Sequence, residues 1–168
     1  KIHNGFDKNP TTTSTAYGLY IGSSPSTGSR PNLVYNNILY NFNTAGTIYG
    51  LYNSGNSNTD WYHNTAIFDH QATGTGAVYA VYFTGTGTNN DFKNNLVYVS
   101  RAGTGTKYGM YVPSTGTGLN SDNNNIAVVA TAGTNYFGYN GSAIATLTAW
   151  RTASQNTWDM NSTDANPL

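Results

Sequence analysis

The sequence predicts an all-β solenoid of about five stacked coils, closed by one short C-terminal helix. Two observations predict this fold: an internal repeat of about 30 residues, and short β-type runs separated by Gly, Thr, Ser and Asn within each repeat. One such repeat cannot bury its own apolar face, whereas stacked repeats can. The repeat therefore indicates a coil in a stack rather than an independent unit.

Three sequence markers define the repeat and follow one another in the same order. Tyr-x-x-Tyr recurs with steps of 32, 30, 29 and 28 residues, at Tyr17/Tyr20, Tyr49/Tyr52, Tyr79/Tyr82, Tyr108/Tyr111 and Tyr136/Tyr139. An Asn before a mostly apolar stretch recurs at Asn37, Asn64, Asn95 and Asn125. Asn-x-Asp recurs at Asn58/Asp60, Asn89/Asp91 and Asn120/Asp122. Variation in the steps places insertions and deletions in the Gly/Ser/Thr segments.

Each repeat holds two short runs that are typical of strands, such as "FKNNLVYV" and "KYGMYV", and a unit of two or three short strands suits a β-solenoid. These runs are rich in β-branched and aromatic residues and too short for helices. Helical repeats of similar length would need two amphipathic stretches of about ten residues or more, and none is visible. We therefore expect strands and turns over residues 1–141.

The composition excludes several classes of protein. The 168 residues suit a single domain, and the absence of Cys excludes disulfides and thiolate metal sites. Only 8% of residues are charged and the net charge is zero, so we expect no nucleic-acid partner. No apolar run approaches the roughly 18 residues of a membrane span. Because 38% of residues are hydrophobic, we expect a packed core rather than disorder, in a mature or excised piece of a longer protein.

Alternation along the strands predicts which side chains face the core. Leu19, Leu51, Val81 and Met110 form a column that should point inward, and the first Tyr of each Tyr-x-x-Tyr shares that parity, so it should face inward or lie at a corner. The second tyrosines should point outward beside a Gly/Ala column. These candidate binding residues are Tyr20, Tyr52, Tyr82, Tyr111 and Tyr139. The alternative is that they only stabilise one another.

Two polar columns are also expected. Asn37, Asn64, Asn95 and Asn125 should form an asparagine ladder at a coil corner, because Asn tolerates bends and its amide can bond the next coil. Asp60, Asp91 and Asp122 should form a second column, where like charges on neighbouring strands repel. Either these carboxylates cap turns and face water, or they bind Ca²⁺, which prefers such ligands.

The last segment, residues 142–168, departs from the repeat and should cap the solenoid. "SAIATLTAWRTAS" is the best helix candidate, with Ser142 as a possible N-cap and Ile144, Leu147 and Trp150 at helical spacing. An open solenoid exposes unpaired strand edges. A short helix that places Trp150 over the last coil would cover them, as part of the same domain.

Several stretches carry a resemblance to a known group: "YNNILYN", "WYHNTAIFDH", "GAVYAVYFTG" and "FKNNLVYVS", together with the C-terminal segment. They resemble the right-handed parallel β-helix repeats of pectate-lyase-like solenoids in large secreted or surface-anchored bacterial proteins, of the type IX secreted, bacteroidete kind. The resemblance implies a right-handed parallel β-helix and an extracellular or cell-surface location. It implies little about activity, because this fold hosts lyases, hydrolases, adhesins and passive stalks.

The function expected from these features is non-catalytic. Lyases of the resembled fold use calcium-binding acids and a basic proton abstractor, and Lys93 near Asp91 is the one place to look for that chemistry. His63 and His70 are interpreted as surface or packing residues, and no catalytic residue is assigned. We expect a rigid surface scaffold, or an adhesin or filament segment, with polysaccharide, a cell-surface protein or other copies of itself as partners. The alternative is a carbohydrate-binding or polysaccharide-degrading, lyase-like β-helix.

Overall fold

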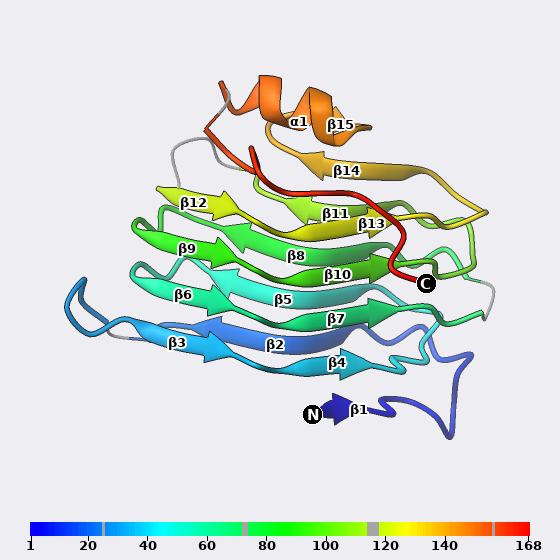
Figure 1. Ribbon diagram of the computed structural model, residues 1–168. Coiled ribbons are helices and arrows are strands. Elements are labelled where there is room, and N and C mark those ends of the chain that lie inside the picture. The colour runs from blue at the N-terminus through cyan, green and yellow to red at the C-terminus, as the bar shows by residue number, and fades with distance from the viewer. Residues whose placement is uncertain (25, 72–73, 114–117, 156) are drawn as a thin grey trace.

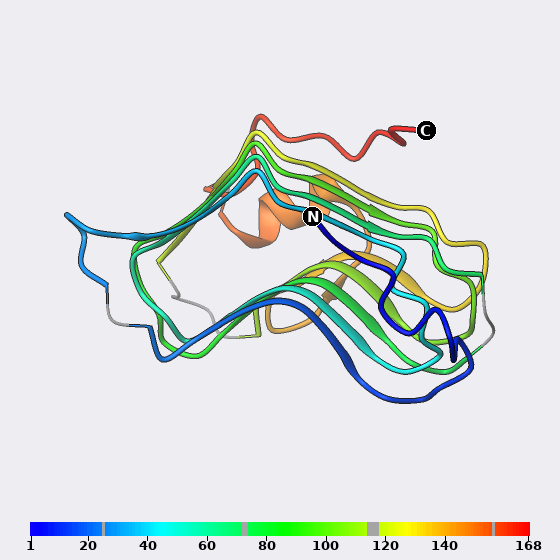
Figure 2. The same cartoon turned by 90° about the horizontal axis from the view of Figure 1, so that it is seen from below.

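The computed structural model describes residues 1–24, 26–71, 74–113, 118–155 and 157–168, and it is a parallel β-solenoid (Figure 1). Each coil contributes one strand to each of three sheets, and the chain rises from coil to coil in a right-handed sense (Figures 1 and 2). The predicted all-β fold is confirmed. It has about four turns rather than five, because the fifth Tyr-x-x-Tyr lies on a strand after which the chain turns back.

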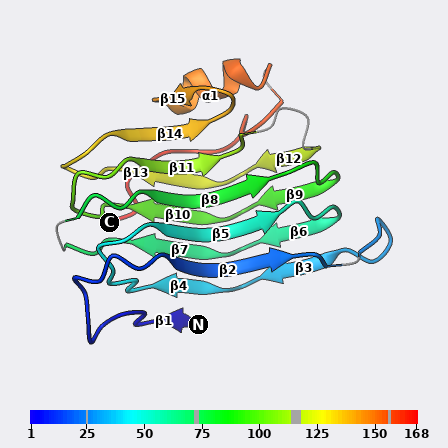
Figure 3. The same cartoon turned by 180° about the vertical axis from the view of Figure 1, so that it is seen from behind.

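Sheet 1 contains the Tyr-x-x-Tyr strands and forms one long side of the solenoid (Figure 3). Its parallel strands are β2 (Ala16–Gly22), β5 (Ile48–Ser54), β8 (Val78–Thr84), β11 (Lys107–Tyr111) and β14 (Asn135–Tyr139). The short β15 (Ala143–Ile144) pairs antiparallel with β14 and ends the sheet.

Sheets 2 and 3 form the opposite side and meet at a sharp corner (Figure 2). Sheet 2 consists of β3 (Asn32–Tyr35), β6 (Thr59–Tyr62), β9 (Asn90–Lys93) and β12 (Leu119–Asp122). Sheet 3 consists of β1 (Ile2–His3), β4 (Ile38–Tyr40), β7 (Thr65–Phe68), β10 (Leu96–Val99) and β13 (Asn125–Val128). All pairings in these two sheets are parallel.

The core lies between sheet 1 and the other two sheets. Leu51, Val81 and Met110 are fully buried, which confirms the inward apolar column, and Leu19 at its open end is partly buried. Sheet 2 contributes Trp61, which no solvent reaches. Burial of this kind contributes roughly 1.5–3 kcal/mol per large apolar side chain, so the stack of coils supplies the core that a single coil lacks.

The asparagine ladder exists, but one of its predicted members is wrong. Asn37, Asn64, Asn95 and Asn124 stack at the corner, and each of the last three accepts hydrogen bonds from the backbone N–H and side-chain amide of the Asn one coil before it. Asn125 is instead the first residue of β13 and pairs with Leu96. The residue preceding each ladder Asn adopts a left-handed conformation, which turns the chain at the corner; these residues are Asn36, His63, Asn94 and Asn123.

Two cations lie in the interior beneath the Gly/Thr turns. Arg101 is 1% exposed and donates to the carbonyl oxygens of Thr44, Gly46 and Gly76. Lys107 is fully buried, and its ammonium donates to two carbonyl oxygens, of Gly103 and Ala132. Backbone carbonyls of successive turns thus accept from both cations, which ties neighbouring coils together, although Nε of Arg101 is buried without a hydrogen-bond partner.

The C-terminal cap is confirmed, although its helix begins later than predicted. Helix α1 spans Leu147–Ala153, and its N-cap is Thr146 rather than Ser142. Trp150 is fully buried over the last coil, and its indole N–H donates to Asp159, 2.8 Å away. The buried Asp159 carboxylate also accepts from Ser121, which fastens the cap to β12. Among the described residues, no helix is long and apolar enough to cross a membrane.

Candidate binding surface

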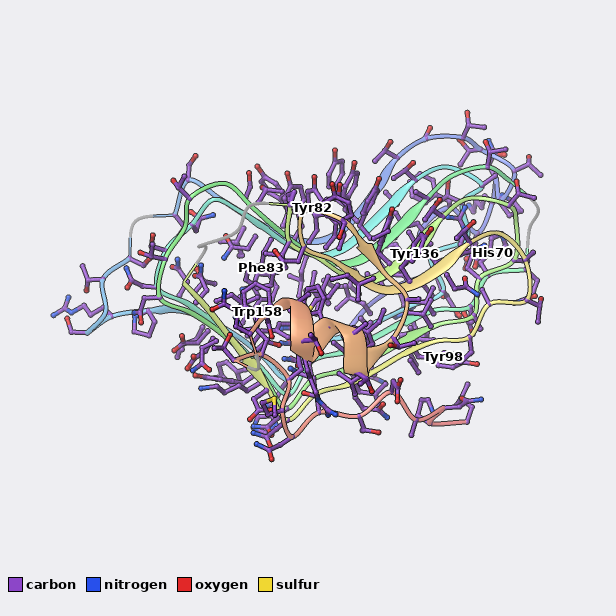
Figure 4. The ribbon with its side chains drawn as sticks, turned by 90° about the horizontal axis from the view of Figure 1, so that it is seen from above. His70, Tyr82, Phe83, Tyr98, Tyr136 and Trp158 are labelled. Carbon is purple, nitrogen blue, oxygen red and sulfur yellow. The ribbon has the colours of Figure 1, made fainter. Side chains whose placement is uncertain are left out.

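Both tyrosines of every Tyr-x-x-Tyr point outward, which corrects the prediction for the first of each pair. In β5, Tyr49 and Tyr52 are half-buried on the outer face, while Gly50 and Leu51 between them are both buried. The paired register skips the glycine, so strict alternation fails at this point. Figure 4 shows the same outward direction for Tyr82, with Phe83 pointing inward.

The glycine column explains this departure. A Cβ at Gly50 would lie 2.3 Å from the Ala80 carbonyl oxygen and 2.5 Å from the Phe68 ring. Only glycine, or alanine at position 80, fits against the core here, and the strands of sheet 1 are bent rather than flat (Figure 2). The predicted smooth outer column of Gly and Ala is therefore wrong, because these residues face inward.

Two columns of five tyrosines consequently form one aromatic surface on sheet 1, called here the tyrosine face. In the first column, neighbouring rings stack almost parallel, with centroids 5.0–5.6 Å apart and interplanar angles of 8–19°. This column consists of Tyr17, Tyr49, Tyr79, Tyr108 and Tyr136. Offset stacking of this kind is a favoured aromatic geometry.

The second column contains the five candidates predicted to point outward. Its neighbouring ring centroids are 4.5–5.1 Å apart, from the edge-on pair Tyr20–Tyr52 to the stacked pair Tyr111–Tyr139. The columns also touch each other within strands, as at Tyr79 and Tyr82, 5.3 Å apart. The outward direction of this set is confirmed, and its role in binding stays a prediction.

This packing decides what the face offers to a partner. Because rings of the first column cover one another's faces, that column presents ring edges and hydroxyls rather than open π-faces. The rings are more open at the N-terminal end of the face, where Tyr17 of the first column and Tyr20 of the second are 54% and 53% exposed. There, Tyr17, Tyr20 and Tyr52 line an open hollow of about 410 Å³.

The tyrosine face carries no charge near neutral pH. Burial, followed by the nearby phenols of Tyr49 and Tyr52, raises the pKa of Tyr82 to about 12. Burial followed by neighbouring phenols also raises the pKa of Tyr49, Tyr108 and Tyr111. Each of these four phenols therefore remains a neutral hydrogen-bond donor and acceptor.

The outer face of sheet 2 holds the second candidate group, and its register differs from the prediction. Asp60 pairs with Asp91, but the next member of that column is Asn120, whose amide donates to Asp91 across 2.7 Å. Asp122 instead pairs with Lys93 in the adjacent column. The three aspartates therefore do not form one ladder, because the neutral donor Asn120 takes the third place in the column.

Asp91 is the centre of this group. Lys93 lies 3.2 Å from its carboxylate, and the Tyr62 hydroxyl donates to it. Burial alone would raise the pKa of Asp91, but hydrogen bonds from Tyr62, Lys93 and Asn120 hold it below its usual value. Burial and then the charge of Asp91 raise the pKa of Asp60. Over the described part of the chain, no group of three or more His, Cys, Asp or Glu is arranged to hold a metal ion.

Comparison with known proteins gives no family for this chain. No protein-family model, curated protein or solved structure matches it. The function must therefore be argued from the geometry of the two surfaces described above.

Among the described residues, no side-chain hydrogen bond joins His63 or His70 to the tyrosine face or to the group around Asp91. His63 is an exposed corner residue with φ of +55°, in the row that precedes the asparagine ladder. His70 is partly buried near Arg101, and burial followed by that cation lowers its pKa. Neither contacts a nucleophile or a carboxylate in a catalytic arrangement that the hydrogen bonds reveal.

Sequence reasoning missed half of the tyrosine face. The signal that could have found it is the Gly in "YGLY", because a small residue between two tyrosines permits two successive inward positions. It also missed Tyr62 and Asn120 as partners of Asp91, since pairing between coils, rather than spacing within one repeat, brings them together.

Proposed function

We propose that this chain is a non-catalytic β-helix module that acts as a rigid scaffold outside a bacterial cell, as a segment of an adhesin or filament. The observation that supports this proposal is the tyrosine face, two continuous rows of side chains on a stack of coils. A solenoid presents such rows at a fixed spacing of about 4.8 Å. The resemblance of the repeats to secreted and surface-anchored solenoids supports the location.

The chemistry of the face favours an extended, hydrogen-bonding partner. Ring edges are apolar and phenol hydroxyls both donate and accept, a combination that suits polysaccharides, surface proteins or a second copy of this chain. The face is uncharged, so binding should depend only weakly on salt, unlike the binding of phosphate-bearing ligands.

A double substitution tests this function. Tyr52→Ser with Tyr82→Ser removes two central rings of the second column and should abolish most adhesion to polysaccharide-coated surfaces or most self-association, measured by pull-down and sedimentation velocity. The matched control is Leu33→Ser with Tyr35→Ser, two exposed residues on β3 outside the face. A melting curve for each variant separates folding from binding.

If the Tyr52/Tyr82 variant loses stability yet binds surfaces and sister copies as the wild type does, the tyrosine face is structural only. If the Leu33/Tyr35 control loses binding equally, the contact surface lies elsewhere. Either outcome removes the basis of the scaffold-and-adhesion proposal.

The alternative, a carbohydrate-binding or lyase-like β-helix, rests on the group around Asp91. One specific observation favours it: neighbouring carboxylates whose pKa values are shifted in opposite directions, Asp60 upward and Asp91 downward. Such separation is typical of acid and base pairs in catalytic sites. In this alternative, Lys93 would neutralise an acidic sugar, and Ca²⁺ near Asp60 and Asp91 would assist.

An activity assay distinguishes this alternative from the scaffold. Acidic and neutral polysaccharides would be incubated with the protein, with and without Ca²⁺, and scored for unsaturated products and new reducing ends. Activity that disappears in Asp91→Asn and Lys93→Met but survives in Asp164→Asn would establish an enzyme. Calorimetric titration with Ca²⁺ on wild type and Asp91→Asn reports the metal directly, and heat unchanged by the substitution would place any metal elsewhere.

A further inference from the structure

Tyrosines from neighbouring coils lie close enough to react with each other. We propose that the tyrosine face is a site of oxidative crosslinking, at which a peroxidase-type oxidant joins tyrosines of adjacent coils as dityrosine. This inference goes beyond the scaffold function and does not depend on any binding partner. It rests on the distances between rings, their fixed register and their access to solvent.

The geometry is clearest between β8 and β11, in the middle of the stack. Tyr79 and Tyr108 stack with centroids 5.6 Å apart and planes 8° from parallel. Tyr82 and Tyr111 lie 5.1 Å apart with planes tilted by 30°. Both pairs are directly opposite in the parallel register, so the backbone holds them together in every molecule. Modest side-chain rotation brings their ortho carbons into contact.

One-electron oxidation should also be concentrated on the tyrosine face. The chain has no Cys; of its two Met, Met110 is fully buried and Met160 is 47% exposed, on the C-terminal segment outside the tyrosine face. Trp61 and Trp150 are fully buried as well, and Trp158 is partly buried. Tyr17 and Tyr20, by contrast, are more than half exposed and stand at the end of the columns. Since ring contacts continue from coil to coil, an electron vacancy formed there can pass along the stack.

The reaction balances without any group from this chain beyond the two phenols. Each phenol gives up one electron and its hydroxyl proton and becomes a phenoxyl radical. The two radicals couple through one ortho carbon each, and the two ortho hydrogens move to the oxygens, restoring both phenols. Overall, two tyrosines and one H₂O₂ give one dityrosine and two H₂O, so the protein loses two hydrogen atoms per link.

A covalent link between coils has a mechanical consequence. It closes a loop through one full turn of the solenoid and lowers the conformational entropy of the unfolded chain. Crosslinked coils should therefore resist separation under heat or force, which suits a rod that bears load. The hydrogen-bonded stack positions the tyrosines, and oxidation makes the contact permanent.

Peptide mapping provides the test. Trypsin does not cut the Arg30–Pro31 bond, so Tyr79 and Tyr82 fall in peptide 9–93, and Tyr108 and Tyr111 fall in peptide 108–151. The folded protein would be treated with hydrogen peroxide and a haem peroxidase, and the monomer isolated by gel filtration under denaturing conditions. We expect peptides 9–93 and 108–151 joined, at their summed mass less two hydrogens, with dityrosine fluorescence and a higher melting temperature.

Two reciprocal variants assign the link. Tyr79→Phe with Tyr82→Phe, and Tyr108→Phe with Tyr111→Phe, keep the rings but cannot couple, and each should abolish the joined peptides. Tyr35→Phe with Tyr62→Phe, on sheet 2, should leave them unchanged, and circular dichroism would establish that all variants fold. Absence of joined peptides in the wild type, their persistence in either reciprocal variant, or their occurrence only in covalent dimers would overturn the proposal.

Discussion

At the scale of single residues, a glycine decides the direction of its neighbours. Gly50 is so close to Ala80 and Phe68 that it must face the core, and Leu51 after it faces the core too. Two successive inward residues leave both flanking tyrosines outside. The inward column remains the apolar one that alternation predicts, and this column is where substitutions should matter most.

Val81→Asp tests that column. Val81 is fully buried, so the substitution would place an unpaired carboxylate in the stack and should lower the free energy of unfolding by about 3 kcal/mol or more. Ile38→Asp is the control, because Ile38 is exposed on β4, where it pairs with the uncharged Thr65. Chemical denaturation compares the two, and a Val81→Asp protein as stable as the control would place position 81 outside.

Ionisation of Tyr82 should lower the free energy of unfolding at alkaline pH. Its phenol ionises near pH 10 when unfolded but only at about 12 when folded, so the folded state holds more protons between these values. The stabilisation is complete below pH 10 and is lost as pH rises through 12. The free energy of unfolding should therefore fall across this window, and Tyr82→Phe should make the fall shallower. An identical slope in the variant would contradict the burial of this phenol.

At the scale of elements, the corner ladder and the cap hold the coils in register. Asn95 accepts from the Asn64 backbone N–H at 2.9 Å and donates to the Trp61 carbonyl at 2.9 Å, so one amide connects two consecutive coils. Asp159 does the same at the C-terminal end, where it joins α1 to β12. These buried polar groups set the register between residues of neighbouring coils.

Asn95→Ala measures the contribution of the ladder. The substitution leaves the Asn64 N–H and the Trp61 carbonyl without their partner. Each unsatisfied buried group should lower the free energy of unfolding by roughly 1–3 kcal/mol. Asn125→Ala is the matched control, since Asn125 is half-buried and lies outside the ladder. Thermal melts should show a large loss for Asn95→Ala and little change for Asn125→Ala. A loss for Asn95→Ala no larger than that for Asn125→Ala would contradict a stabilising ladder.

At the scale of the whole molecule, stability should rise from the ends of the solenoid to its middle. In a linear array each coil is held mainly by its neighbours. Strands β5, β8 and β11 are paired on both sides, whereas β1 pairs through two residues only and β2 has one partner strand. The centre of the stack is therefore doubly supported.

Hydrogen exchange should reveal this gradient. Amides of β8 are expected to exchange most slowly, and those of β1 and of the outer edge of β2 most quickly. Mass spectrometry of peptides after timed labelling gives the order directly. Uniform protection along the chain would show instead that the solenoid opens as one cooperative unit.

The sequence by itself determined the repeat, the strand segments, the inward column of Leu51, Val81 and Met110, and the helix that carries Trp150 over the last coil. These features follow from periodicity, because the residue pattern within one repeat sets the apolar face of each strand and the length of each coil. It also indicated the outward direction of the second tyrosine column.

Only the tertiary structure decided the register between coils. From the third complete coil to the fourth, the step is 29 residues for Tyr79 to Tyr108, Asp91 to Asn120 and Asn95 to Asn124 alike. Matching by residue type instead selects Asn125 and Asp122, one and two positions too far along the chain. The physical reason is that coil-to-coil hydrogen bonds and core packing set the pairing, and turns of variable length absorb the difference. The bend at Gly50 is decided in the same way, by atoms of the next coil and of the opposite sheet.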